Sequence, residues 1–199
     1  MKNNTFYINL HFILRPIIKV IFPFSVTGVE HLPADKPVVL CLNHTNAVDP
    51  VVLAFALPRT YPIRIMAKKQ LFSIPGLNWL IRKLGAFPVD RGHNDINAVK
   101  SSIGALRDGY SLMIFPEGTR IKDGRRIEPK SGAAMIAIRS GVEMVPVYLS
   151  ANDRLFRKTR IVIGTPYAPV YTGRKGTAEE YQRNIDEVMD RVYAMGETV

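Results

Sequence analysis

The sequence of 199 residues has little cysteine, few acidic side chains and no long apolar run without charges. Its one cysteine, Cys41, permits no internal disulfide, and no Cys/His cluster has the spacing of metal ligands. The chain also lacks a Gly-x-Ser-x-Gly element, which argues against a serine nucleophile of the α/β-hydrolase type. We therefore expect a protein of a reducing compartment, the cytoplasm, with no metal site.

Acidic residues are outnumbered by basic ones: 27 Lys and Arg against 17 Asp and Glu give a formal net charge of +10. Such an excess favours an anionic partner, which is a nucleic acid, an acidic protein or a membrane surface with acidic lipid. A basic nucleic-acid-binding protein is thus an alternative of a different class. The chain has no interleaved stacking aromatics, zinc-finger spacing or RNA-binding signature, so we predict no nucleic-acid partner.

The most apolar segment is FYINLHFILRPIIKVIFPF (6–24), in which His11, Arg15 and Lys19 recur every four residues. On a helix these three side chains form one stripe. The segment could span about 28 Å as a helix, but its ionisable groups and Pro16 make insertion across a bilayer costly. It also lacks the small residues of a signal-peptide cleavage site. We predict an amphipathic helical segment in the interface of a membrane; a helix packed on the protein's own core is the alternative.

The remaining sequence alternates short apolar runs, bounded by Pro or Gly, with longer stretches of helical period. This alternation is typical of an α/β domain, and we predict a single mixed, mostly parallel sheet flanked by helices. One domain suffices, because a chain of this length can bury about 70% of its unfolded surface. We assign residues 1–25 to the N-terminal segment and 26–199 to the α/β domain. The predicted strands are 37–42, 62–66, 86–89, 111–115, 143–149 and 160–164.

Two of the helices have recognisable boundaries. A helix predicted over 94–108 ends at Gly109 and can be capped by Asn94 or Asp95. Its apolar face is made by Ile96, Val99, Ile103 and Leu106. At the C-terminus, TAEE (177–180) has the Thr-x-x-Glu spacing of a capping box. We expect the helix that follows to pack its apolar stripe on the sheet.

Two short elements are candidates for a functional site. In LCLNHTNAVDP (40–50) a strand is predicted to end at Asn43 and a helix to begin with Asp49 as N-cap and Pro50 in the first helical position. This interpretation leaves His44 unexplained, although a His five residues before an Asp is a common spacing by chance. The second element, FPEGTR (115–120), turns at the carboxyl end of a buried strand, where α/β sheets place their sites.

Taken together, NHTNAVD, GAFPVDRG, FPEGTR and VPVYLS resemble, in order and spacing, the glycerophospholipid acyltransferase family, and its bacterial 1-acylglycerol-3-phosphate acyltransferases in particular. The resemblance covers roughly residues 28–170 and includes AKKQLFSIPGLNWL (67–80) and KSGAA (130–134). Gln70 and Pro129 stand where members more often carry an acidic and an aromatic residue, a departure that bears on acceptor fit. The resemblance implies transfer of a fatty acyl chain from a thioester to the sn-2 hydroxyl of 1-acylglycerol-3-phosphate, giving phosphatidic acid.

The chemistry of this reaction explains the His and the Asp. A thioester is already activated, so the lipid hydroxyl has to lose its proton as it attacks. An imidazole, with an ordinary pKa near 6.5, can take that proton at neutral pH, which makes His44 the expected general base. Asp49 is expected to orient the imidazole with one carboxylate oxygen. We expect its other oxygen to accept the backbone N–H of Val51 or Val52 and so to cap the helix.

The resemblance also implies a site for the acceptor. Arginine suits bidentate binding of a phosphate, and lysine serves as a point charge. Backbone N–H groups in the same turn are candidates for stabilising the oxyanion. The matched substrate-binding positions are Arg91, Glu117, Gly118, Thr119, Arg120 and Lys130. We expect the neighbouring Lys122, Arg125 and Arg126 to form a solvated basic face instead.

Several alternatives stay open at this point. The acceptor can be glycerol-3-phosphate or another lysophospholipid, and a hydrolase or thioesterase would use the same His44 and Asp49 with water as acceptor. The expected partners are a lysophospholipid, an anionic membrane surface, and either acyl-carrier protein or acyl-coenzyme A as thioester co-substrate. We expect no cofactor. The expected location is the cytoplasmic face of the cell membrane, as a peripheral or monotopic protein.

Overall fold

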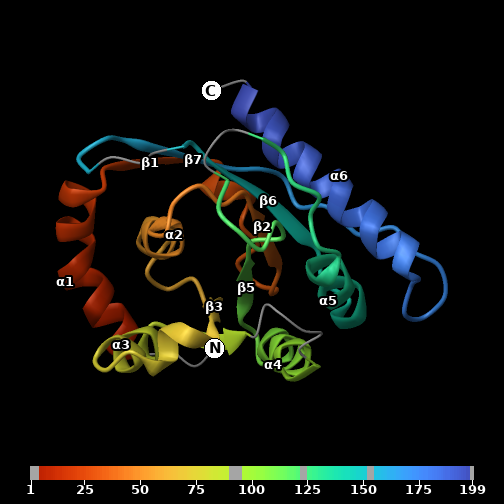
Figure 1. Ribbon diagram of the computed structural model, residues 1–199, viewed down its shortest axis with the longest axis horizontal. Coiled ribbons are helices and arrows are strands. Elements are labelled where there is room, and N and C mark those ends of the chain that lie inside the picture. Colours follow the sequence, from red (N-terminus) through yellow and green to blue (C-terminus); the bar gives the residue numbers. More distant parts are fainter. Residues whose placement is uncertain (1–4, 90–95, 122–124, 152–154, 198–199) are drawn as a thin grey trace.

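The computed structural model describes residues 5–89, 96–121, 125–151 and 155–197, and its centre is one seven-stranded sheet (Figure 1). The strand order is β1-β7-β6-β2-β5-β3-β4. Every neighbouring pair runs parallel except β6 and β7, which are antiparallel. The strands are β1 (Phe24–Thr27), β2 (Val39–Leu42), β3 (Ile63–Lys68), β4 (Ala86–Val89), β5 (Ser111–Ile114), β6 (Met144–Leu149) and β7 (Thr159–Ile163). The predicted fold class is confirmed.

Six of these strands lie where the sequence predicts them, and β1 is the one that the prediction missed. It is only four residues long, and it pairs with β7 at the edge of the sheet. Gly28 follows it with φ 77°, and a Cβ there would lie 2.0 Å from the carbonyl oxygen of Ile163, so glycine is required. β1 begins two residues before the predicted boundary between residues 25 and 26, and that division of the chain stays a prediction.

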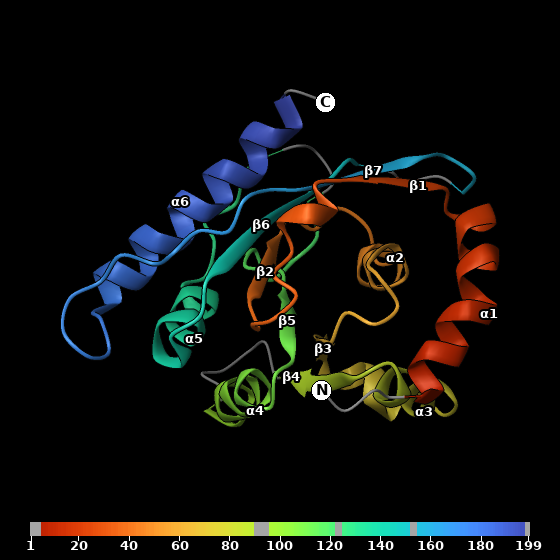
Figure 2. The same cartoon turned by 180° about the vertical axis from the view of Figure 1, so that it is seen from behind.

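Helices cover both faces of the sheet, and α2 lies between α1 and the sheet (Figures 1 and 2). The helices are α1 (Thr5–Ile21), α2 (Asp49–Ala56), α3 (Leu77–Lys83), α4 (Ile96–Arg107), α5 (Gly132–Ser140) and α6 (Ala178–Glu197), with 3-10 helices at Val29–His31 and Lys69–Ser73. Successive residues of β2 serve two cores. Leu40 and Leu42 pack in the core that contains α2, whereas Val39 and Cys41 pack in the core that contains α5 and α6. Burial raises the pKa of the Cys41 thiol to about 12, so Cys41 is a packing residue.

The C-terminal helix begins as predicted. The Glu180 N–H donates to Oγ1 of Thr177 at 3.3 Å, and Oε2 of Glu180 accepts the Thr177 N–H at 2.8 Å, which is the reciprocal pair of a capping box. The predicted stripe is buried against the sheet at Ile185, Val188 and Val192. These contacts fix α6 over β6 and β2.

The other helices agree with the sequence to different extents. α4 ends just before Gly109, whose φ is 86°, whereas Asn94 and Asp95, its two predicted caps, lie outside the described residues. Ile96 was assigned to the apolar face of α4 but is exposed. The sequence pattern marks the bounds of neither α3 nor α5. α5 reads GAAMIAIRS, and so apolar a segment has too little polar contrast to mark one face.

α1 packs against the protein through polar side chains and through Ile18, which lies against the core that contains α2. The Tyr7 hydroxyl donates to the carbonyl of Ala54 at 3.0 Å, and Nε of Arg15 donates to the carbonyl of Phe55 at 3.1 Å. Both carbonyls belong to the last turn of α2, where a helix has no N–H of its own to offer. Part of the predicted basic stripe therefore caps α2, and Pro16 lies inside one continuous helix. The structure shows the alternative, a helix packed on the protein's own core. Placement of α1 in a membrane interface stays a prediction.

Other apolar side chains of α1 face outward. Four large apolar side chains on it are 50–71% exposed: Phe12, Ile13, Ile17 and Val20. Within the described residues, no helix combines the length and the hydrophobicity that crossing a membrane requires.

His11 occupies the contact between α1 and α2. Its ring centroid lies 5.8 Å from that of Tyr7 and 5.3 Å from that of Phe55, and the residue is only 2% exposed. Burial, and then the charge of Arg15, lower the pKa of His11 below its ordinary value. His11 is therefore neutral in the folded protein at neutral pH.

We expect this contact to lose stability in acid. The unfolded chain binds a proton at residue 11 near pH 6.5, before the folded protein does, so the stabilisation is complete above that pH and decreases as the pH falls toward the folded pKa. His11→Gln should reduce the difference in Tm between pH 7.5 and pH 5, measured by calorimetry, by roughly 2–4 °C for each kcal/mol involved. The Tm at pH 7.5 reports the pH-independent cost of the substitution. If the difference in Tm between the two pH values is the same in His11→Gln as in the wild type, the claim that His11 is neutral and buried is contradicted.

Candidate active site

The pairing of β2 with β5 brings the two candidate elements together. These strands are parallel neighbours, and Cys41 pairs with Ile114. Continuing this register by three positions places His44 opposite Glu117. The His44 backbone N–H donates to Oε2 of Glu117 at 2.9 Å. Residues 73 positions apart in the sequence thus share one site at the carboxyl ends of the strands, as α/β sheets arrange their sites.

Asn43 fixes the start of the loop that carries His44. Its Nδ2 donates to the carbonyl of Leu149 at 2.8 Å, and its Oδ1 accepts the Leu149 N–H at 2.8 Å. The buried side-chain amide thus takes the place of a backbone partner beyond the end of β2. On the other side, the carbonyl of His44 accepts the N–H of Ile121 at 2.8 Å. The backbone of His44 is held on both sides of the loop.

His44 and Asp49 form a buried hydrogen-bonded pair. Nδ1 of His44 lies 3.1 Å from Oδ2 of Asp49. The same oxygen accepts the backbone N–H groups of Thr45 at 2.8 Å and Asn46 at 2.7 Å. A carboxylate is an acceptor only, so Nδ1 carries the proton and Nε2 keeps its lone pair. This is the tautomer that a general base toward a substrate requires.

The predicted capping role of Asp49 is wrong. The N–H groups of Val51 and Val52 both donate to the carbonyl of Val48 at 2.9 Å, so they have no need of a side-chain acceptor. Val48 is the N-cap, Asp49 is the first helical residue and Pro50 the second. From the first position the short Asp49 side chain reaches back to the loop that precedes the helix. Asp49 therefore organises the loop around His44.

Glu117 and Phe115 complete the surroundings of His44. The Phe115 ring centroid lies 4.3 Å from that of the imidazole, at an interplanar angle of 37°. Glu117 is buried, and its Oε1 accepts the hydroxyl of Tyr193 from α6. Burial raises the pKa of Glu117, while the hydrogen bonds from Tyr193 and from the His44 N–H act in the opposite direction. The sequence does not point to Tyr193, because it lies next to Val192 on a helix whose recognisable features are a capping box and an apolar stripe.

The remaining predicted substrate residues lie around the FPEGTR turn. The N–H of Gly118 donates to the carbonyl of Phe115 at 3.1 Å, so it is engaged within the turn. Lys130 lies against Gly118, since a Cβ at that glycine would be 3.3 Å from Cε of Lys130. Thr119, Arg120 and Lys130 are exposed. Arg91 lies outside the described residues.

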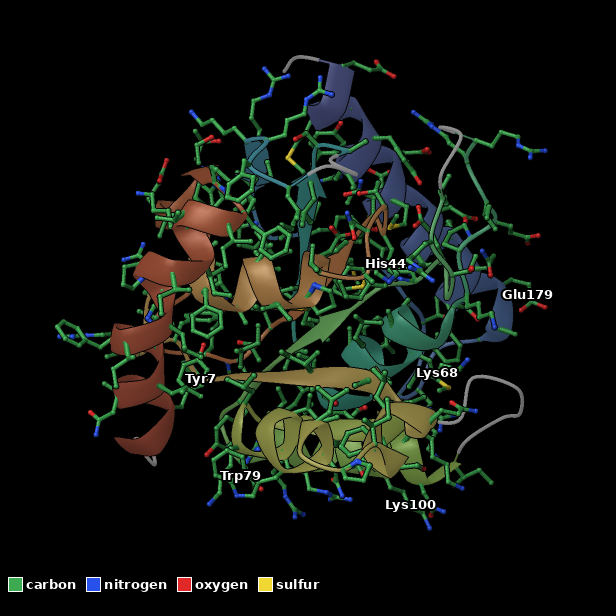
Figure 3. All side chains as sticks on the ribbon, turned by 60° about the vertical axis from the view of Figure 1, so that its left-hand side comes forward. Tyr7, His44, Lys68, Trp79, Lys100 and Glu179 are labelled. Atoms are coloured by element: carbon green, nitrogen blue, oxygen red, sulfur yellow. The ribbon has the colours of Figure 1, made fainter. Side chains whose placement is uncertain are left out.

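These residues can perform proton transfer. His44 lies near the centre of the view in Figure 3, on the loop between β2 and α2. Its imidazole is oriented by a carboxylate, with exposed cationic side chains on the nearby turn. In the described parts of the chain, no group of three or more His, Cys, Asp and Glu side chains could hold a metal ion.

Sequence comparisons point to one family. The family model described as Acyltransferase matches residues 23–150. The 1-acyl-sn-glycerol-3-phosphate acyltransferase of Bacillus subtilis is 33% identical over 158 residues, which is 77% of this chain and 78% of that protein. The chloroplastic 1-acyl-sn-glycerol-3-phosphate acyltransferase of Arabidopsis thaliana is 32% identical over 152 residues, 73% of this chain and 42% of that protein. The chain therefore spans about two fifths of the length of that plant relative.

A solved structure extends the likeness to most of the chain. The crystal structure of the 1-acyl-sn-glycerophosphate acyltransferase PlsC from Thermotoga maritima matches with a TM-score of 0.72 and 26% sequence identity. The match covers 97% of this chain and 79% of that chain. The family model alone covers more than half of the residues. From these matches, the chain belongs to the Acyltransferase family.

Proposed function

We propose that this protein is an O-acyltransferase that moves a fatty acyl chain from a thioester to the sn-2 hydroxyl of 1-acylglycerol-3-phosphate. The product is phosphatidic acid, a precursor in phospholipid biosynthesis. The observation that carries the proposal is the buried pair of His44 Nδ1 and Asp49 Oδ2, 3.1 Å apart, next to Glu117. The acceptor is inferred from the relatives in Bacillus subtilis and Arabidopsis thaliana, which are named for it.

The proposed reaction needs one group that accepts and returns a proton. As the acceptor oxygen attacks the thioester carbonyl carbon, Nε2 of His44 takes the hydroxyl proton. The tetrahedral intermediate then breaks its C–S bond, and the departing thiolate takes the proton back from His44. Asp49 keeps Nδ1 protonated and stabilises the imidazolium between the two steps. No side chain becomes acylated, and the reaction as proposed uses no cofactor.

The acceptor phosphate is proposed to bind at the FPEGTR turn. Arg120 and Lys130 are exposed cations there, and Arg91 is added by the family resemblance. Glu117 is proposed to organise the site, because one of its oxygens is bonded to Tyr193 and the other to the His44 N–H. The thioester donor is acyl-carrier protein or acyl-coenzyme A. Both are anionic and suit a chain with a net charge of +10.

Replacing His44 tests the base. His44→Ala should lower the rate of acyl transfer by about 10²- to 10⁴-fold, the usual contribution of a general base. The assay offers 1-acylglycerol-3-phosphate, glycerol-3-phosphate and lysophosphatidylcholine with each thioester, and identifies the products by mass. His31→Ala is the matched control, because that histidine bonds the Ile163 carbonyl outside the site. Activity that survives in His44→Ala contradicts the base assignment. Free fatty acid without any diacyl lipid would instead indicate a hydrolase.

The protein is also proposed to bind an anionic membrane, at the cytoplasmic face of the cell membrane, through the outer side of α1. Phe12, Ile13, Ile17 and Val20 form an apolar strip there, with the basic Arg15 and Lys19 also exposed on the same helix. Apolar side chains flanked by basic ones are the composition of an interfacial helix. The lipid acceptor and the phosphatidic acid product would then enter and leave within the membrane surface.

A segment at the C-terminal end of α1 extends this apolar strip. At its C-terminal end, the N–H of Phe156 donates to the carbonyl of Ile21 at 2.9 Å, and both Phe156 and Leu155 are exposed. Phe156 has φ 64°, a conformation that is uncommon for a bulky residue. The proposed contact therefore involves α1 and the segment that carries Leu155 and Phe156.

Removing apolar side chains from α1 tests the membrane contact. The double substitution Phe12→Ser and Ile17→Ser should reduce co-sedimentation with vesicles of phosphatidylglycerol and phosphatidylcholine by more than about tenfold, since each buried apolar side chain is worth roughly 1.5–3 kcal/mol. Ile96→Ser is the matched control, because Ile96 is 66% exposed but belongs to α4, on the other face of the sheet. Equal loss of binding in both variants would contradict a specific role of α1.

A further inference from the structure

The C-terminal helix reaches into the candidate active site through one side chain. The hydroxyl of Tyr193 donates a hydrogen bond to Oε1 of Glu117, 76 positions earlier in the sequence. The other oxygen, Oε2, accepts the backbone N–H of His44 at 2.9 Å. We propose that Tyr193 is a positioning residue for the base: it holds the Glu117 carboxylate, which in turn holds the backbone of His44. The inference rests on the proposed function of His44.

Glu117 depends on these donors because it is buried. Only 3% of its surface is exposed, and an ionised carboxylate can only accept hydrogen bonds. A buried anion is costly unless donors surround it. Without the Tyr193 hydroxyl, Oε1 loses a donor and the neutral carboxyl becomes easier to form. A neutral carboxyl is a weaker acceptor for the His44 N–H, since hydrogen bonds to an ionised group are roughly twice as strong.

Tyr193 is itself held on its outer side by Arg126. The guanidinium carbon lies 4.5 Å from the centroid of the Tyr193 ring. The same guanidinium donates to Oδ1 of Asp190 at 3.3 Å and to Oε1 of Glu197 at 3.5 Å. These acidic residues lie about one turn before and after Tyr193 on α6. Arg126 is 53% exposed, as expected for a residue on a solvated basic face, and its guanidinium also lies over the Tyr193 ring.

The rest of α6 sets the position of the Tyr193 hydroxyl relative to the sheet. Met189 and Val192 are buried in the core that also contains Val39 and Cys41 of β2. The helix therefore cannot shift without disturbing the strand that leads to His44. Tyr193 lies outside residues 23–150, the range matched by the family model, whereas Glu117 and His44 lie inside it.

The charged and titratable groups around this link come from several elements. His44 follows β2, and its charge favours ionised Glu117, whereas the charge of Asp49, on α2, opposes it. On the side of Tyr193, Arg126 favours loss of the phenolic proton, while Glu117 and Tyr148, on β6, oppose it. Burial and the bond to Glu117 raise the pKa of Tyr193, so the phenol stays a donor across the working pH range. Loss of that donor is therefore expected to move the titration of Glu117 to higher pH.

Tyr193→Phe removes the hydroxyl and keeps the ring beneath Arg126. We expect kcat at pH 7 to fall about tenfold, the effect of losing one hydrogen bond to a charged group, with the KM values for both substrates unchanged within about twofold. The acid limb of the kcat–pH profile should move to higher pH. Tyr181→Phe is the matched control: it removes a hydroxyl on the same helix that donates to the carbonyl of Lys175. It should change neither kcat nor the profile. The Tm of both variants verifies that the assayed protein is folded.

Two further measurements show whether Tyr193 acts through Glu117. In a Glu117→Gln background, Tyr193→Phe should lower kcat by less than about twofold. The reason is that substitutions of residues that act through one another do not have additive effects. In ¹⁵N-labelled wild-type chain, the amide proton of His44 should resonate downfield and move upfield in Tyr193→Phe, which requires no turnover. If the wild-type protein transfers no acyl chain but its His44 amide proton moves upfield in Tyr193→Phe, the proposed function is refuted. The link from Tyr193 through Glu117 to His44 is then still supported. Two results would overturn the inference. In the first, Tyr193→Phe keeps the kcat, the kcat–pH profile and the His44 amide shift of the wild type. In the second, Tyr193→Phe lowers kcat equally in the wild-type and the Glu117→Gln backgrounds.

Discussion

The parallel pairing of β2 with β5 is the constraint on which the site depends. Both strands are buried on both faces, and alternate residues of β2 belong to two different cores. A shift of one residue would exchange these side chains between the cores and separate the His44 N–H from Glu117. The packing of the whole sheet therefore specifies a contact between two loops. A hydrogen bond of 2.9 Å between them depends on a register fixed by apolar side chains.

The short helix α2 connects the site to α1 on the outside of the molecule. A helix of eight residues is marginal by itself, so both of its ends need partners. At the first residue, Asp49 binds the loop around His44, and at the other end Tyr7 and Arg15 of α1 bind the last carbonyls. Polar side chains of α1 thus bind α2, while the apolar Phe12, Ile13, Ile17 and Val20 stay exposed. One helix joins the proposed base to the proposed membrane contact.

The sequence predicted the elements whose cause is local, and it missed those that depend on distant partners. Six strands were recognisable as apolar runs, and the capping box at Thr177 involves residues three positions apart. β1 was missed because four residues are too few for a pattern, and its place in the sheet comes from β7. The N–H donors to the Asp49 carboxylate were wrongly assigned, because a backbone N–H that already has a partner looks the same in a sequence as one that does not. Tyr193 carries no signal at all.

The FPEGTR turn combines two roles that its sequence does not separate. Phe115 and Glu117 are buried and contact the imidazole ring and the backbone of His44, whereas Thr119 and Arg120 are exposed. Gly118 lies between the two halves with φ 67°, where the chain turns from the interior toward solvent. Each oxygen of the Glu117 carboxylate already accepts a hydrogen bond from the protein, so the inner half of the turn holds the backbone of His44, the proposed base. The outer half, with Lys130 beside it, carries the exposed cations that are proposed to bind the acceptor phosphate.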